Sequence, residues 1–193
     1  MHNPVLTHLL TRKSAPITTF GGAEPPQADI DLMLTAAARV PDHGRLTPWR
    51  FIIYRGECRN VIGDRLAELA LKRDPSMPPG AVEKERTRFN RAPLVIGVIY
   101  VPVAHERIPE WEQQLSAGAA AMNLVHAATA LGYCAHWLTN WFAFDAAGRA
   151  LLGLKPDERV AGFIHVGHSS FDVPERPRPA LADIVSEYSG PVE

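Results

Sequence analysis

The sequence has few cysteines, almost no net charge and no long apolar run. Its 193 residues include only two cysteines, Cys58 and Cys134, which lie far apart in the chain. Two cysteines do not make a disulfide framework, so the sequence favours a reducing, cytoplasmic environment. Basic and acidic residues number 20 and 21, which gives a net charge of −1. This balance provides no basic field that would attract nucleic acid or an anionic membrane.

Several familiar motifs are also missing. The N-terminus lacks a signal-peptide pattern, and no apolar run is long enough to span a membrane. The chain has no G-x-S-x-G, C-x-x-C or P-loop motif. No G-x-G-x-x-G follows an expected strand, so a Rossmann-type dinucleotide fold is not expected. His165 and His168 lie three apart in an expected strand and would face opposite sides, so a catalytic metal is not expected.

Hydrophobic periodicity predicts helices and strands within one domain that covers residues 1–193. Helices are predicted at 4–11, 27–39, 57–73, 81–91 and 111–132, and a short one at 145–152 with Asp145 as its cap. Strands are predicted at 49–55, 94–101, 133–139 and 159–168. The unbroken apolar run 94–101 predicts a central strand buried on both faces. The stretch 74–91 is interpreted as a surface excursion, a lid or, as its composition favours, a plain linker.

The loop at 39–51, with the sequence RVPDHGRLTPWRF, is the most informative stretch of the chain. Pro41 disfavours helix at the residue before it, and Pro48 fixes the entry to the next strand. A loop constrained at both ends can hold side chains in fixed directions, as a bound ligand requires. Two simpler interpretations stay open: Arg39 as a helix C-terminal cation, and His43 as a side chain bonded to its own turn.

Two basic segments are candidates for an anion site. Arg12-Lys13-Ser14 follows the first predicted helix, and Arg178 lies in the Pro-rich tail E-R-P-R-P. The guanidinium of Arg12 could grip a phosphate with several donors, and Ser14 could add a hydroxyl. Alternatively, the first group places cations against a helix dipole, and the tail is an extended surface segment.

The helix predicted at 111–132 is rich in small residues. The run Ser116–Ala121 is small on every side, and this lets other helices approach closely, so a central helix is expected. One face carries Leu115, Gly118, Ala119, Met122 and Val125. A close helical partner on this face is consistent with a homodimer.

Four segments, in order, resemble motifs of the nitroreductase family of flavoproteins, in its small single-domain branch. Residues 41–51 resemble P-D-H-x-x-x-x-P-W-x-F, and residues 12–14 resemble R-R-S, with Lys13 in the middle place. Residues 111–124 resemble W-E-x-x-x-S-A-G-A-A-x-x-N-L. Residues 132–139 resemble G-x-x-x-x-W-x-S, with Leu138 where a polar or basic residue is expected. Together the matches span most of the chain.

This resemblance implies an α+β, nitroreductase-like fold, in which helices flank a mainly antiparallel sheet, and an intertwined homodimer with FMN at each interface. It also implies a set of cofactor-binding residues. The FMN phosphate and ribityl chain would be held by Arg12, Lys13, Ser14 and Arg178, and the flavin would lie beside Trp137, Leu138 and Thr139. Arg39 and His43 would reach in from the opposite subunit, near Arg45 and Thr47. The nicotinamide would meet Ala127, Ala128, Thr129, Ala130, Leu131 and Gly132.

The activity that the resemblance implies is an FMN-dependent, ping-pong transfer of a hydride from NAD(P)H to nitroaromatic, quinone or similar electron-poor acceptors. The flavin would carry this chemistry, without a protein nucleophile or a metal. Two alternatives stay open. One is an FMN carrier or redox sensor without turnover. The other is a different flavin reaction on the same fold, such as dehydrogenation or dehalogenation.

Overall fold

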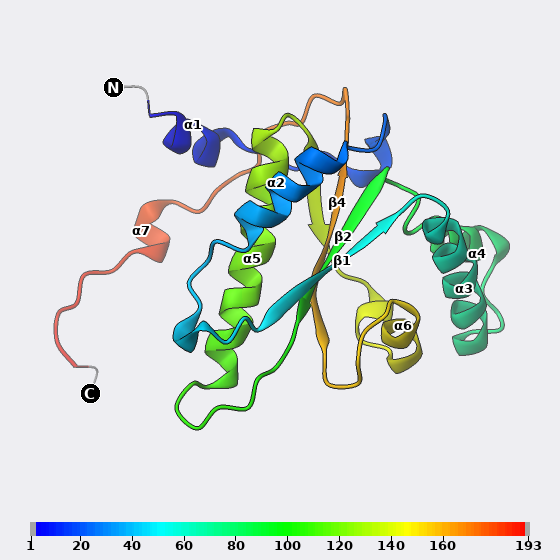
Figure 1. Cartoon of the computed structure of the whole chain (residues 1–193). Helices are drawn as coiled ribbons and strands as arrows, with labels where there is room; N and C mark the ends of the chain where they lie inside the picture. The colour runs from blue at the N-terminus through cyan, green and yellow to red at the C-terminus, as the bar shows by residue number, and fades with distance from the viewer. Residues whose placement is uncertain (1–2, 192–193) are drawn as a thin grey trace.

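A four-stranded antiparallel sheet forms the centre of the protein (Figure 1). A computed structural model of the chain describes residues 3–191. The strand order is β1 (Trp49–Arg55), β2 (Leu94–Tyr100), β4 (Arg159–Gly167) and β3 (Cys134–Leu138). β1 pairs with β2 from Trp49 opposite Tyr100 to Arg55 opposite Leu94. All seven residues of β2 are buried, which confirms the predicted central strand.

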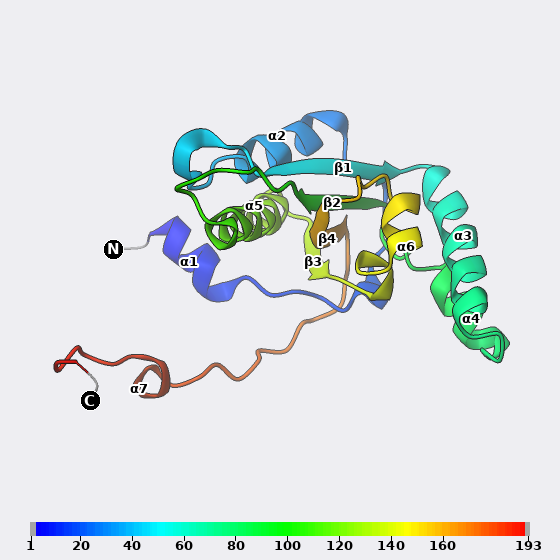
Figure 2. The ribbon, with the colours of Figure 1, turned by 90° about the horizontal axis from the view of Figure 1, so that it is seen from below.

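Helices cover both faces of this sheet, as Figures 1 and 2 show. On one face lie α2 (Gln27–Ala37) and α5 (Glu110–Ala130), which pack on each other. Their core contains Ile30, Met33, Leu124 and the inner side chains of β2 and β4. The other face carries α3 (Cys58–Arg73), α4 (Pro79–Arg86) and α6 (Ala146–Leu151), over an aromatic cluster that consists of Tyr54, Phe89, Phe142 and Phe163. The predicted α+β fold with an antiparallel sheet is confirmed.

The ends of the elements agree with local chemistry. Asn3 caps α1 (Pro4–Thr11), since its side chain accepts from the N–H groups of Val5 and Leu6. Asp145 caps α6 as predicted and accepts from the N–H of Gly148. The helix predicted at 27–39 ends earlier, at Ala37, where the amide of Asn123 on α5 donates to the carbonyl of Ala36 in the last turn and to that of Arg39 beyond it. Three 3-10 turns, Ile17–Thr19, His43–Arg45 and Trp141–Ala143, and the short α7 (Leu181–Ile184) complete the described elements.

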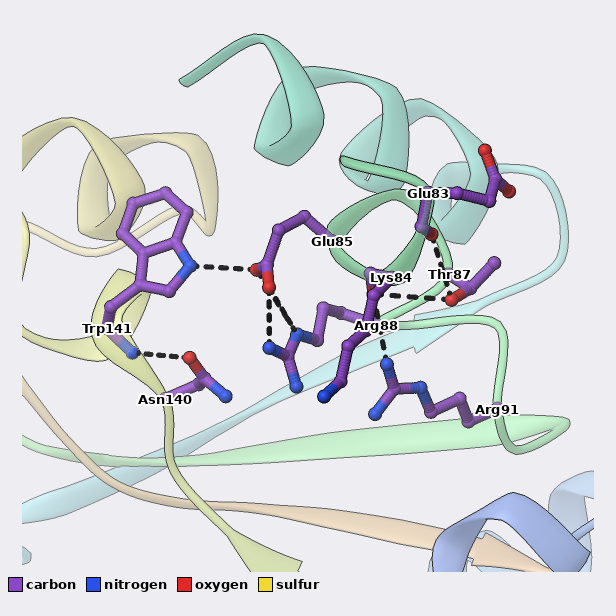
Figure 3. Close-up of polar contacts among 8 residues, drawn as sticks. All are labelled: Glu83, Lys84, Glu85, Thr87, Arg88, Arg91, Asn140 and Trp141. Atoms are coloured by element: carbon purple, nitrogen blue, oxygen red, sulfur yellow. Dashed lines mark hydrogen bonds and ion pairs between the residues drawn. The ribbon is translucent and has the colours of Figure 1, made fainter. Parts of the chain in front are cut away.

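Residues 74–91 are not a plain linker, so the interpretation that composition favoured is wrong. They contain α4, which docks through the buried carboxylate of Glu85 (Figure 3). Glu85 accepts from Arg88 at 2.5 Å and from the indole N–H of Trp141 at 2.8 Å. Burial raises the pKa of Glu85, but these hydrogen bonds outweigh it and leave the pKa lowered. Gly63 of α3 permits the approach, because a Cβ there would overlap the carbonyl of Arg86.

α5 is the central helix that its small residues predicted, but the face that it buries is not the stripe expected from the sequence. The buried face carries Ala117, Ala120, Ala121, Leu124 and Ala128, and these small side chains let the helix lie close to the sheet. Of the stripe expected to pack, Val125 is buried, Gly118, Ala119 and Met122 are half-buried, and Leu115 is 56% exposed.

The segment after β4 leaves the sheet and runs past α1 towards the C-terminus (Figure 2). Apolar side chains in and after α7 are largely exposed: Leu181, Ile184, Val185 and Tyr188. Along α1, Val5, Leu6, Leu9 and Leu10 are exposed in the same way. None of the helices in residues 3–191 combines the length and the apolarity needed to cross a bilayer.

Candidate functional site

The C-terminal end of α1 and the tail together enclose a cavity of about 440 Å³. After α1 ends, the chain becomes extended at Arg12, and the tail crosses this segment from the other side. The cavity brings together Arg12, Lys13, Ser14 and Arg178, the four residues that the family resemblance assigned to the FMN phosphate and ribityl chain. Its complete lining is Leu9, Leu10, Arg12, Lys13, Ser14, Val173, Pro174, Arg176 and Arg178.

The polar groups of this cavity are already partly oriented. A guanidinium nitrogen of Arg12 donates to the hydroxyl of Ser14 at 3.2 Å. The ammonium of Lys13 donates to the carbonyl of Val173 at 2.9 Å, which ties the tail to this segment. Glu175 is the one carboxylate within residues 3–191 that forms ion pairs with these cations, at 3.6 Å from Lys13 and 3.4 Å from Arg178. Cations therefore outnumber acidic groups at this site.

The crowding of cations has an electrostatic cost. Burial and then the nearby charge of Arg178 lower the pKa of Arg12, so both effects disfavour its charged form in the ligand-free protein. A bound phosphate would relieve this cost, because it accepts charge-assisted hydrogen bonds from several donors at once. The donor set of guanidinium, ammonium and hydroxyl groups therefore fits the phosphate and ribityl oxygens of FMN.

One contact connects β3 to the segment that follows Arg12. The carbonyl of Ala15 and Nδ1 of His136 are 2.8 Å apart, and this contact fastens the segment after Arg12 to β3. The next residue, Trp137, donates from its indole N–H to the carbonyl of Ala161 at 3.2 Å and stays 38% exposed. Its ring lies across Gly162, where a Cβ would overlap the indole. Leu138 and Thr139 follow at the strand end, so the contact at His136 is the structural link between the two predicted groups.

The loop before β1 is strained and tightly held. Arg45 and Thr47 both have positive φ values, 56° and 49°, which is unusual for residues other than glycine and costs most for a β-branched side chain. The carboxylate of Asp42 holds this conformation, since it accepts from the N–H of Leu46 at 3.0 Å and from the N–H of Thr47 at 2.8 Å. Ser116 of α5 donates to the carbonyl of Pro41 at 2.7 Å. The loop is therefore a fixed scaffold.

His43 on this loop is bonded to α5 and not to its own turn, which corrects the simpler interpretation. Its Nδ1 lies 2.7 Å from a carboxylate oxygen of Glu112. Gly44, with φ of 69°, packs so closely on Ile108 that a Cβ would overlap it. A second cavity, of about 410 Å³, lies at this contact. Its lining is His43, Gly44, His105, Arg107 and Ile108.

Neither Arg39 nor His43 lines the cavity that holds Arg12. Arg39 is exposed at the end of α2. This separation agrees with the expectation that both side chains serve the opposite subunit, and that role stays a prediction.

The run 127–132, expected to meet the nicotinamide, is divided by the structure. Ala127 and Ala130 line a third cavity of about 550 Å³ beside His8 and His126. Ala128 is completely buried in the core, so its methyl group cannot face a ligand. Thr129 bonds back to its own helix at the carbonyl of Val125. Leu131 and Gly132 are exposed beyond the helix end, and the proposed contacts of the run stay predictions.

Sequence analysis missed several residues of these sites. Arg176 also lines the anion cavity, and its place in E-R-P-R-P could have suggested it. Glu112, Ser116 and His136 orient the loop and the strand end across long sequence separations. No local pattern indicates such contacts, because each depends on how α5 and β3 pack.

Comparison with known proteins agrees with this geometry. The model of the nitroreductase family matches residues 11–168. The chain is 30% identical over 159 residues to the Escherichia coli (strain K12) protein YdjA, covering 82% of this chain and 85% of that protein. It is 34% identical over 164 residues to a Haemophilus influenzae protein, covering 84% and 86%. Both relatives are provisionally named NAD(P)H nitroreductases.

Solved structures share the same fold. A nitroreductase-like family protein from Bacillus cereus superposes with a TM-score of 0.80 at 20% identity, covering 98% of each chain. A protein from Desulfovibrio desulfuricans, provisionally named a nitroreductase and solved in complex with FMN, gives a TM-score of 0.75 at 24% identity, covering 99% of this chain and all of the other. The family match over most of the chain, and the two relatives at 30% identity or above, lead to one conclusion: this chain belongs to the nitroreductase family.

Proposed function

We propose that this protein is an FMN-dependent oxidoreductase that transfers a hydride from NAD(P)H to nitroaromatic, quinone or similar electron-poor acceptors. The observation that carries the proposal is the cationic cavity around Arg12, which gathers guanidinium, ammonium and hydroxyl donors. The segment that follows Arg12 is bonded through Ala15 to His136 of β3, one residue before the partly exposed Trp137. A phosphate site on a segment tied to a strand with an aromatic end suits a flavin mononucleotide. The names of the curated relatives and the FMN complex of a structural neighbour support the same cofactors.

In this proposal the chain supplies binding and orientation. Arg12, Lys13, Arg176 and Arg178 neutralise the phosphate, and Ser14 adds a hydroxyl for the phosphate or the ribityl chain. The strand end at 137–139 flanks the ring. The flavin itself supplies the hydride chemistry when it is bound, so no protein nucleophile is required. Ala127, Ala130 and the residues that follow the helix are the parts of 127–132 that can approach the nicotinamide.

We further propose that the working form is a homodimer. The support is apolar surface that has no partner within residues 3–191, namely Leu115 on α5, the four leucine and valine side chains of α1, and the tail around α7. The exposed apolar side chains of α1 and of the tail lie in runs, which a second copy could cover, and Leu115 adds to them on α5. Arg39 and His43 would then serve the partner's flavin. Both cysteines are free, in keeping with the expected cytoplasmic setting.

The test is a visible spectrum of the purified protein followed by steady-state kinetics. A flavin absorption band, with FMN as the released cofactor, is expected. Oxidation of NADPH or NADH should then depend on an added quinone or nitroaromatic compound. Bound FMN without turnover would identify a carrier or redox sensor. Turnover that yields a product other than the reduced acceptor would identify a different flavin reaction on this fold.

A further inference from the structure

The contact between His43 and Glu112 has the form of an oriented acid–base pair. His43 is 63% exposed at its side chain, and its Nδ1 lies 2.7 Å from Oε2 of Glu112, which is itself 38% exposed. A carboxylate accepts hydrogen bonds and cannot donate when it is ionised, so Nδ1 must carry a proton. The contact therefore fixes the orientation of the imidazole ring and leaves Nε2 as the nitrogen that can exchange a proton.

The backbone on both sides of this pair is held by hydrogen bonds. Glu112 lies in the first turn of α5, one residue before Gln113. The side-chain amide of Gln113 accepts from the N–H of Val103 at 2.9 Å and donates to the carbonyl of Val103 at 2.8 Å. His43 follows Asp42, which holds the strained loop. The pair thus lies between two loops that α5 fastens, and the backbone that carries each partner is held in place.

Few charged or titratable side chains face His43. Glu112 comes from α5, and His105 and Arg107 come from the loop before α5. The imidazole of His105 is occupied, because its Nδ1 accepts from the N–H groups of Arg107 and Ile108. A fourth cavity, of about 290 Å³, is lined by His43 and Glu112 together with Leu115 and Ala119, on the face of α5 proposed to meet the partner.

We propose that His43 and Glu112 form a proton-delivering pair for acceptor reduction, with His43 as the donor and Glu112 as the positioning residue. This inference rests on the proposed function and on the dimer that brings His43 to the partner's site. Reduction of a quinone takes up a hydride from the reduced cofactor and one further proton. That proton leaves Nε2 of the charged imidazole, which becomes neutral and keeps its Nδ1–H bonded to Glu112. Solvent then restores the proton at Nε2.

The proton balance defines the acceptors that need this pair. A nitro group that becomes a nitroso group and water also consumes one hydride and one proton. Ferricyanide, in contrast, takes electrons and binds no proton. The pair should therefore accelerate the reduction of quinones and nitroaromatic compounds and leave the reduction of ferricyanide unaffected.

The test compares these acceptors in the FMN-loaded dimer. Glu112→Ala and His43→Ala should lower the rate of reoxidation by a quinone about tenfold or more, within the usual range for general acid catalysis. In Glu112→Ala, which keeps the imidazole of His43 and with it the flavin contact assigned to that residue, the rate with ferricyanide and the reduction by NADPH should match the parent. Glu110→Gln is the matched control, because Glu110 lies in the same helical turn and pairs with Arg159 at 3.4 Å. It should leave all of these rates unchanged.

A measurement independent of turnover reads the pair directly. Long-range ¹H–¹⁵N correlation of the imidazole of His43, in the oxidised holoprotein, should show a proton on Nδ1 in the parent and in Glu110→Gln. Glu112→Ala should shift the neutral ring towards the Nε2–H form. A parent ring without a proton on Nδ1 would overturn the proposal.

The kinetic outcomes separate this inference from the proposed function. Equal slowing with quinone and with ferricyanide would show that the pair tunes or places the flavin, and it would overturn proton delivery while leaving the reductase activity in place. Unchanged quinone rates in both variants would overturn it as well. A parent protein that reduces no acceptor of either class would remove the proposed function and this inference together.

Discussion

Replacing Arg12 by alanine should weaken FMN binding without weakening the ligand-free fold. The effect on FMN affinity and the effect on stability differ because the charged form of Arg12 is electrostatically unfavourable in the folded protein. Burial and the charge of Arg178 both disfavour its guanidinium in the ligand-free protein. The contact of Arg12 with Ser14 at 3.2 Å is a single, long hydrogen bond that solvent can replace. Removing the side chain therefore takes away repulsion along with a minor contact.

The magnitude follows from the interaction that is lost on the ligand. A hydrogen bond to a charged group contributes about 1.5–3 kcal/mol, which corresponds to an increase of roughly ten- to hundredfold in Kd. Arg178→Ala should weaken binding by a similar factor, since its side chain lines the same cavity. Arg65→Ala is the control, because Arg65 is exposed on α3 and pairs with Glu68 at 2.9 Å. It should leave the Kd for FMN unchanged.

Two measurements decide the result. Titration of the ligand-free protein with FMN, followed by flavin fluorescence, gives the Kd. Thermal unfolding without FMN gives the stability of the fold, which should stay level or rise in Arg12→Ala; the stabilisation that added FMN provides should shrink. An unchanged Kd would show that the cavity around Arg12 does not hold the phosphate. A large loss of stability without FMN would show that Arg12 has a structural role instead.

Four further outcomes are expected. Glu85→Ala should destabilise the protein by about 3–5 kcal/mol in urea unfolding, because it leaves Arg88 without its buried partner. Since the pKa of Glu85 is lowered on folding, its contribution is complete above the ordinary glutamate value of about 4.3 and is lost as the pH falls through the folded value. Thr47→Gly should stabilise the protein by about 0.5–1 kcal/mol in the same assay, as the relief of strain exceeds the added entropy of the unfolded chain. Ala119→Trp should overpack the exposed face of α5 and yield monomers in sedimentation. Finally, double-reciprocal plots at several acceptor concentrations should be parallel, since one flavin site would serve both substrates; intersecting lines would require a ternary complex.

Much of the fold was predictable because its signals are local. The continuous apolar run of β2 requires burial on both faces, and the structure places this strand within the sheet. Asp145 caps α6 through a contact three residues away, at Gly148. α4 was harder to interpret, because its stability depends on Trp141, fifty-six residues further along the chain. A polar stretch that docks through one buried carboxylate has the composition of a linker.

In the candidate site, too, the features with local signals were predictable, and those that depend on distant contacts were not. Arg12 and Ser14, the residues proposed to bind the phosphate, are close in sequence, and a guanidinium beside a hydroxyl group indicates an anion site directly. The loop conformation was only partly predictable: its prolines mark the ends, but the positive φ values of Arg45 and Thr47 follow from the two hydrogen bonds that Asp42 accepts. The partner of His43 could not be predicted, because Glu112 lies sixty-nine residues away on α5.

α5 explains why this chain needs so many small residues in one helix. Its inner alanines let the helix approach the sheet, and this brings its first turns within reach of both loops at that end. There Gln113 binds one loop and Ser116 binds the other, while Glu112 holds His43. A larger residue at Ala117 or Ala120 would push the helix outward and lengthen all three contacts at once. The close packing of α5 is therefore a condition for the geometry of the site and not only a source of stability.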